Sequence, residues 1–158
     1  MVPNMYANMA NAPAMLATYR DGYARFRVES GFSASEQEVA FLAISQENGC
    51  SYCTAAHGFL ADKVSGVARE DIRAILDGRD PADPRLAAVA QLAREMVRSR
   101  GWPSAGVVAA FLGAGFREDQ VLHLLLAVSV KTISNYANHL FGTTVDAPFA
   151  EHRDALSR

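Results

Sequence analysis

The sequence predicts an all-α fold, and three observations support that prediction. Apolar residues recur at intervals of three and four along most of the chain, and the alternation typical of strands is absent. Capping residues precede several of these segments, and Gly, Asn or Asp follow them. The chain has 158 residues, half of them apolar, which is enough for one domain with its own core. We therefore expect a single helical domain over residues 1–158.

The first two helices have clear boundaries in the sequence. The first is expected from about Ala12 to Val28 and is ended by Gly31. Ser33 and Glu36 have the spacing of a capping box, in which each side chain bonds to the backbone of the other residue, and they open the second helix. Asn48-Gly49 ends that helix, because both residues tolerate left-handed backbone angles.

The remaining helices follow from the same signals. Asp83 is a capping residue and Pro84 suits a first helical position, so a helix is expected to begin there. The segments at the two ends, 1–11 and 142–158, are expected to be arms. Between them we expect helices from Cys50 to about Val64, Arg69 to Leu76, Pro84 to Arg100, Ser104 to about Gly113, and Arg117 to Phe141.

The sequence also contains an internal repeat with an offset of 84 residues. Gly31-Phe32 aligns with Gly115-Phe116, and six of the 22 positions that begin there are identical. An ancestral duplication of a helical unit is therefore expected. The second copy lacks the polar residues of the first, because Ser134, Ala137 and Leu122 replace Cys50, Cys53 and Glu38.

The only two cysteines of the chain lie in one short motif, Cys50-Ser51-Tyr52-Cys53, and His57 follows four residues later. On a helix, the spacing i, i+3, i+7 places two thiols and an imidazole on one face. A thiol with a pKa near 8.5 is mostly protonated at neutral pH and needs activation. The start of the helix can lower the pKa of Cys50, and His57 can accept the proton of Cys53.

A histidine base needs a partner on its other ring nitrogen, and the preceding helix offers two carboxylates. Glu47 lies beside the Asn-Gly turn, where a solvent-exposed position is expected. Glu38 lies among apolar residues of the same helix. We therefore expect Glu38 to orient His57.

These residues resemble a known family. A glutamate twelve residues before a CxxCxxxH motif, here Glu38 and the Cys50–His57 segment, is similar to the AhpD-like members of the carboxymuconolactone decarboxylase superfamily. The resemblance extends from Pro13 to the stretch 131–139. It implies an AhpD-like helical bundle with an internal repeat, assembled as a trimer or hexamer.

The resemblance also implies a function. The family's proton relay corresponds to Glu38, His57 and Cys53, with Cys50 as the more exposed sulfur that exchanges with a partner. The expected activity is reduction of alkyl hydroperoxides through a redox-active disulfide, or electron transfer to a peroxiredoxin. The reductant would be a lipoyl-type or thioredoxin-like dithiol, and no cofactor is required. One departure is Tyr52, because AhpD has a histidine immediately before its second cysteine.

Three other interpretations remain open. Cys50, Cys53 and His57 could bind zinc if His123, His139 or Glu38 completed the site. A carboxymuconolactone decarboxylase-type activity would not use the cysteine pair. A non-catalytic assembly module would have cysteines that do not form a disulfide.

Composition excludes some partners. A net charge of -2 without a basic run gives no electrostatic surface for nucleic acid or an anionic membrane. The most apolar stretch, 121–130, is about half the roughly 20 residues that cross a bilayer. The N-terminus lacks the pattern of a secretory signal, so we expect a cytoplasmic protein, in which a structural disulfide is disfavoured.

Overall fold

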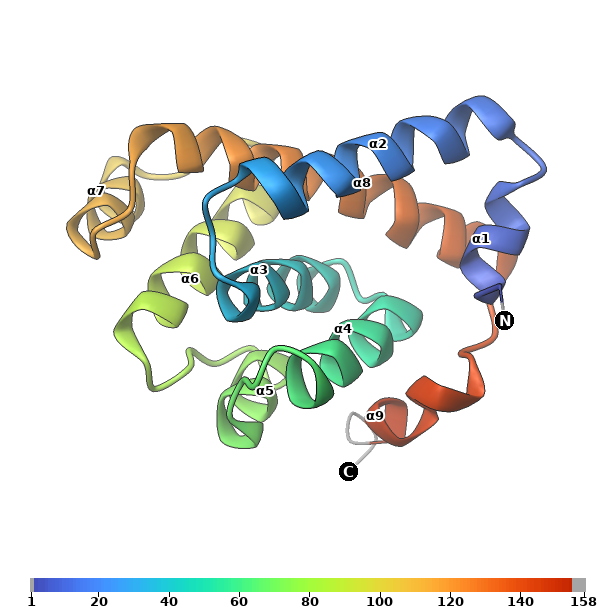
Figure 1. Ribbon diagram of the computed structural model, residues 1–158. Coiled ribbons are helices and arrows are strands. Elements are labelled where there is room, and N and C mark those ends of the chain that lie inside the picture. The colour runs from blue at the N-terminus through green and yellow to red at the C-terminus, as the bar shows by residue number, and fades with distance from the viewer. Residues whose placement is uncertain (1, 155–158) are drawn as a thin grey trace.

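A computed structural model describes residues 2–154, and every regular element in that range is helical (Figure 1). The prediction of an all-α fold is therefore confirmed. The elements are α1 (Asn4–Met9), α2 (Pro13–Glu29), α3 (Ala34–Glu47), α4 (Ser51–Lys63), α5 (Arg69–Leu76), α6 (Pro84–Arg98), α7 (Ala105–Gly113), α8 (Glu118–Phe141), a 3-10 turn (Ala147–Phe149) and α9 (Ala150–Asp154).

Helix α3 is the centre of the fold. It packs against α4, α5, α6 and α8, while α2 and α8 lie side by side across the top of Figure 1. The six residues from Val39 to Ile44 are all fully buried. A helix that is apolar on every side belongs in a core. Glu38, which directly precedes this run, is therefore held away from solvent.

The corner between α3 and α4 places the first cysteine. The predicted capping box is present, because the Ser33 hydroxyl accepts from the Glu36 N–H and the Glu36 carboxylate accepts from the Ser33 N–H. At the other end of α3, Gly49 has a φ of 67°, and the Cys50 N–H donates to the Ser45 carbonyl at 2.9 Å. This tight reversal leaves Cys50 as the N-cap of α4.

The internal repeat is visible in the turns that precede α3 and α8. Gly31 and Gly115 both have positive φ, 68° and 89°, and the rings of Phe32 and Phe116 lie 5.5 Å apart in the core. The copies differ further along. The first breaks at Asn48-Gly49 into two helices, whereas α8 runs unbroken through the equivalent positions, 132 and 133. One copy thus forms a corner, and the other forms a long helix that packs against it.

The two ends of the chain differ from the expected arms. Residues 4–9 form α1, whose Met5 and Met9 are buried, and residues 147–154 form a helical segment that packs on α4. Asp146 joins the two ends by accepting from the Asn4 N–H at 3.2 Å. These helices are too short to show a repeat of apolar residues from which they could be predicted. Their stability comes from tertiary contacts. Residues 155–158 of the expected arm lie outside the described residues.

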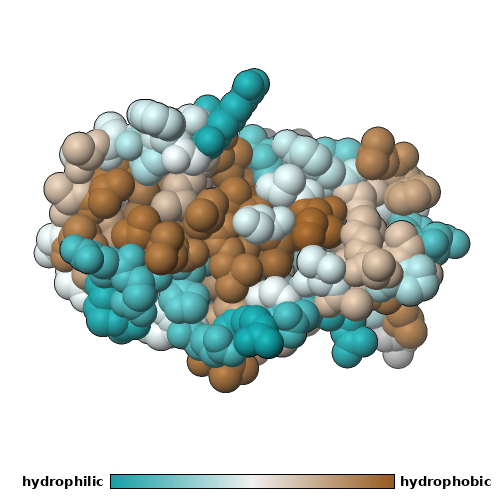
Figure 2. Space-filling view, turned by 90° about the horizontal axis from the view of Figure 1, so that it is seen from above, coloured by the Kyte–Doolittle hydropathy of each residue, from teal (hydrophilic) through white to brown (hydrophobic). Residues whose placement is uncertain are grey.

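Exposed apolar side chains follow one side of α8. Figure 2 shows apolar surface on the face above α2 and α8. The exposed large apolar residues of α8 are Leu122, Leu125, Tyr136, Leu140 and Phe141. Among the described residues, no helix combines the length and apolar character needed to cross a membrane.

We predict that Gly22→Ala destabilises the protein. A Cβ on Gly22 of α2 would lie 2.7 Å from Cγ1 of Val130 on α8, and Val130 is buried. Overpacking of this kind costs about 1–3 kcal/mol of the free energy of unfolding, measured by urea denaturation. Gly106→Ala is the control, because the Cβ position at Gly106 in α7 is open. Equal stability of Gly22→Ala and the parent would contradict the close approach of α2 and α8.

Candidate active site

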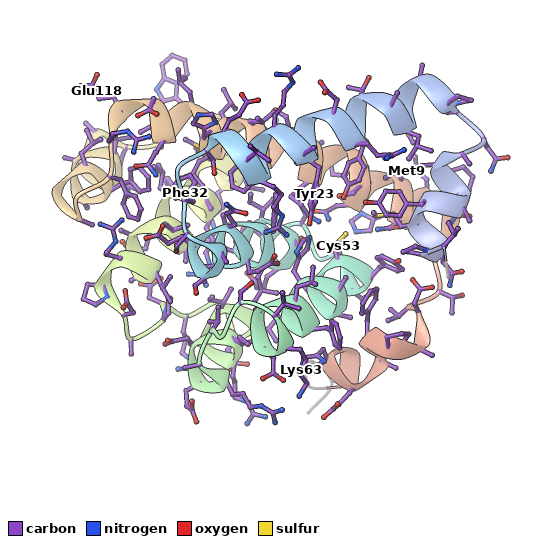
Figure 3. All side chains as sticks on the ribbon, viewed as in Figure 1. Met9, Tyr23, Phe32, Cys53, Lys63 and Glu118 are labelled. Carbon is purple, nitrogen blue, oxygen red and sulfur yellow. The ribbon has the colours of Figure 1, made fainter. Side chains whose placement is uncertain are left out.

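The four residues predicted from the sequence come together in the interior. Glu38 projects from α3, and Cys50, Cys53 and His57 belong to the first two turns of α4 and its N-cap. All four are buried, and each cysteine is only 1% exposed. In Figure 3 the Cys53 side chain points into the interior between α4 and the helices above it. The two cysteines are free thiols.

His57 is held at both ring nitrogens. Its Nδ1 lies 2.8 Å from Oε2 of Glu38, and its Nε2 lies 2.8 Å from Nζ of Lys131. Because the carboxylate accepts and the ammonium donates, the partners select the neutral tautomer with the proton on Nδ1. Burial and the charge of Lys131 lower the pKa of His57, which favours the same neutral form.

The second oxygen of Glu38 faces a second cation. The Arg27 guanidinium forms an ion pair with Oε1 of Glu38, and it lies 4.8 Å from the ring centroids of Tyr23 and Phe41. Burial raises the pKa of Glu38, but the hydrogen bonds from His57 and Arg27 and the charge of Arg27 outweigh it and hold the pKa below its usual value. Glu38 is therefore a carboxylate. The alternative candidate, Glu47, instead pairs with Arg98 at 2.8 Å.

The two thiols have different surroundings. Asn138 Nδ2 lies 3.3 Å from Sγ of Cys53 and 3.9 Å from Sγ of Cys50, and Ser134 Oγ lies 3.9 Å from Sγ of Cys53. A hydrogen bond from Cys50 and the charge of Lys131 lower the pKa of Cys53 despite its burial. The same hydrogen bond, together with burial, raises the pKa of Cys50. Cys53 is therefore the thiol that ionises first.

Cys50, the expected exchanging sulfur, is itself buried, and each cysteine is only 1% exposed. Two other expectations about these thiols need correction. The Cys53 N–H at the start of α4 does lower the pKa of Cys50, but the side-chain hydrogen bond to Cys53 and burial outweigh it, so the pKa is raised. His57 has no ring nitrogen left for Cys53, because Glu38 and Lys131 occupy both.

Three residues of α8 contact this site and were not identified as site residues from the sequence. Lys131, Ser134 and Asn138 have the spacing i, i+3, i+7, the same as Cys50, Cys53 and His57, and all three are buried. The one sequence feature that could have pointed to them is a lone lysine, Lys131, within a predominantly apolar helix. Their partners are more than 70 residues away in sequence, so local reasoning could not connect them.

The residue that departs from AhpD lies outside this network. Tyr52 is buried, and its hydroxyl donates to Asp146, the residue that also binds the N-terminal backbone. It therefore connects α4 to the two ends of the chain. The described part of the chain brings together no group of three or more His, Cys, Asp or Glu side chains that could hold a metal ion.

We predict that His57 stays neutral, as the Nδ1–H tautomer, at pH values below the usual histidine pKa of about 6.5. Two-dimensional NMR of ¹⁵N-labelled histidine side chains measures both the tautomer and the titration. An Nε2–H tautomer, or a midpoint near 6.5, would contradict the Glu38–His57–Lys131 arrangement.

The lowered pKa of His57 also makes the stability of the protein depend on pH. The unfolded chain binds a proton at His57 near pH 6.5, whereas the folded chain resists it because its His57 pKa is lowered. The contribution of His57 to the free energy of unfolding is therefore fully present above pH about 6.5, and it is lost as the pH falls toward the His57 pKa of the folded protein.

Comparison with known proteins places this site within a family. The fold matches crystal structures of the debrominase Bmp8 (TM-score 0.83, 14% identity, 99% of this chain and 84% of that chain) and of an AhpD-core, peroxidase-related protein from Ralstonia eutropha JMP134 (0.83, 19%, 94% and 80%). A peroxidase-related protein from Silicibacter sp. TM1040 is equally similar (0.82, 21%, 94% and 79%). No curated protein sequence matches significantly. The family model for carboxymuconolactone decarboxylases matches residues 10–95, more than half of the sequence, and so the chain belongs to the carboxymuconolactone decarboxylase family.

Proposed function

We propose that the protein is a thiol-dependent peroxidase that reduces alkyl hydroperoxides by cycling Cys50 and Cys53 between dithiol and disulfide. The observation that carries this proposal is the asymmetry of the pair. Cys53 faces the amide of Asn138 and the charge of Lys131, whereas the surroundings of Cys50 favour the neutral thiol. An ionised nucleophile beside a protonated second thiol is what peroxide reduction requires.

In the first step, the Cys53 thiolate attacks the terminal oxygen of the hydroperoxide. The O–O bond breaks, the sulfur becomes a sulfenic acid, and the alkoxide takes up a proton to leave as an alcohol. Asn138 is suited to the substrate, because its Oδ1 is buried without a hydrogen-bond partner and can accept from the hydroperoxide O–H.

In the second step, Cys50 attacks the sulfenic sulfur. The S–O bond breaks, and the hydroxide that leaves combines with the Cys50 proton to give water. The sum is one dithiol monoanion, one hydroperoxide and one proton, converted to a disulfide, an alcohol and water. An external dithiol of the lipoyl or thioredoxin type then reduces the disulfide through a mixed disulfide with Cys50. Because Cys50 is 1% exposed, its neighbours must move for that exchange.

The adaptor alternative uses the same cysteines without the peroxide step, and a peroxiredoxin would then receive the electrons. A decarboxylase-type reaction gives the buried dithiol no role. The peroxidase proposal is preferred because the ionised thiol is the one beside the unpartnered Asn138 oxygen.

We predict the following for turnover of an alkyl hydroperoxide with dihydrolipoamide as reductant. Cys53→Ser abolishes it, and Cys50→Ser reacts once and leaves a sulfenic acid at Cys53 that dimedone traps. Glu38→Gln lowers the rate about tenfold or more, since the neutral amide orients His57 toward Lys131 less firmly and a rise of one unit in the Cys53 pKa is a tenfold loss of thiolate. Glu47→Gln is the matched control on the same helix and retains the parent rate.

Two outcomes would contradict the peroxidase proposal. If dihydrolipoamide reduces the disulfide but hydroperoxide does not oxidise the thiols, the adaptor function is correct. If the thiols react with neither, the redox function itself is wrong.

We also propose that the protein self-associates through the exposed apolar side of α8. Contiguous apolar surface of this kind marks interfaces between protein chains. We predict that light scattering gives the mass of a trimer or hexamer, and that Leu122→Glu together with Leu140→Glu gives a monomer. Val64→Glu is the control, because Val64 is exposed on a different element. A monomeric parent would contradict this proposal.

A further inference from the structure

Lys131 is a buried cation without a carboxylate partner. It lies in the interior part of α8, is 1% exposed, and directs Nζ at His57 Nε2 and toward the ring of Phe41, whose centroid is 5.5 Å away. Among the described residues, no carboxylate lies within ion-pair distance of its Nζ; the nearby Glu38 pairs with Arg27 and His57.

The charges of the buried cluster do not balance without a further anion. Arg27 and Glu38 neutralise each other, and His57 is neutral in the tautomer that its partners select. The positive charge of Lys131 remains. A buried charge without a counter-ion costs several kcal/mol, so proteins pair such charges or neutralise them.

We propose that the thiolate of Cys53 is the counter-ion of Lys131. The two groups belong to the same cluster, because Ser134 and Asn138, one and two turns after Lys131 on α8, lie 3.9 Å and 3.3 Å from Sγ of Cys53. The cation therefore occupies the same helix face as the groups that contact the sulfur. Other titratable and charged groups around the pair are Tyr19, Tyr23 and Arg27 of α2, Glu38 of α3, and Cys50, Tyr52 and His57 at and within α4.

This assignment changes the role of His57. In a direct relay the imidazole would remove the proton of Cys53. Here its Nε2 accepts from Lys131, and Glu38 holds its Nδ1, so the chain from Glu38 through His57 ends on the ammonium. Lys131 then acts on the sulfur through its charge, and His57 is a positioning residue that holds the ammonium.

The ion pair also affects the redox equilibrium. Formation of the disulfide removes the thiolate and leaves Lys131 as a buried, uncompensated cation. The dithiol is therefore favoured relative to the disulfide, which makes the disulfide easier for an external dithiol to reduce. This consequence rests on the proposed function, whereas the ion pair itself can be tested without turnover.

The first experiment measures the ionisation of Cys53 directly. In the Cys50→Ser protein, Cys53 is the only thiol, and thiolate absorbance at 240 nm is followed against pH. We expect a midpoint below the reference value of about 8.5. Adding Lys131→Met should raise the midpoint by about one pH unit or more, which is a tenfold change in the ionisation equilibrium. Lys63→Met is the control, because Lys63 is exposed at the end of α4.

In the protein with both cysteines, Lys131→Met should make the disulfide about tenfold harder to reduce by dihydrolipoamide, a shift of about 30 mV to a more negative potential. An unchanged Cys53 midpoint in a Lys131→Met protein with the parent's circular dichroism spectrum would overturn the proposal.

A second variant keeps the positive charge and removes the lysine. In the Cys50→Ser protein, Lys131→Arg should leave the Cys53 midpoint below the reference value of about 8.5, because the guanidinium is also a cation. A Cys53 midpoint at or above that reference value in Lys131→Arg would overturn the proposal even if Lys131→Met does not fold. If the ion pair is found but hydroperoxide turnover is absent, the proposed function fails and this inference stands.

Discussion

The buried chain Glu38–His57–Lys131 is the interaction on which the proposed chemistry depends. Three polar groups, from three different helices, are held at hydrogen-bond distances of 2.8 Å with almost no access to water. Such a network is stable only if every member is paired and its charges balance. Arg27 satisfies the carboxylate at one end, and the free positive charge lies at the other end, near the cysteine pair. The requirement for neutrality thus directs negative charge to one sulfur.

The scaffold explains how those groups meet. The central helix α3 is buried on all sides and carries Glu38 into the core, and the Gly49 turn reverses the chain so that α4 returns beside it. The second repeat copy lacks that turn and forms the unbroken helix α8, whose polar face closes the site. Thr132 and Ile133 stand where the first copy has Asn48 and Gly49, so α8 continues through these positions and contributes Lys131 and Asn138 to the site.

Sequence reasoning succeeded where local chemistry determines structure. The capping box at Ser33 and the Asn-Gly turn defined α3 and the start of α4, and the apolar neighbours of Glu38 distinguished it from Glu47. It failed where distant contacts decide. A lysine in an apolar helix gives no sign of its partner 74 residues earlier. Met5 and Met9 are buried, although their own helix, α1, is too short to show an apolar periodicity in the sequence. The near-complete burial of both cysteines was also beyond local reasoning, because α1 and the C-terminal helical segment pack against α8 and α4, the helices that carry the site.

The central claim is that one hydroperoxide converts the two thiols of one chain into a disulfide. Mixing the reduced protein with one equivalent of an alkyl hydroperoxide, followed by intact-mass spectrometry and a thiol count in denaturant, tests it directly. The account predicts loss of two hydrogen atoms and of both thiols, with no oxygen retained. Unchanged mass with both thiols free would contradict it.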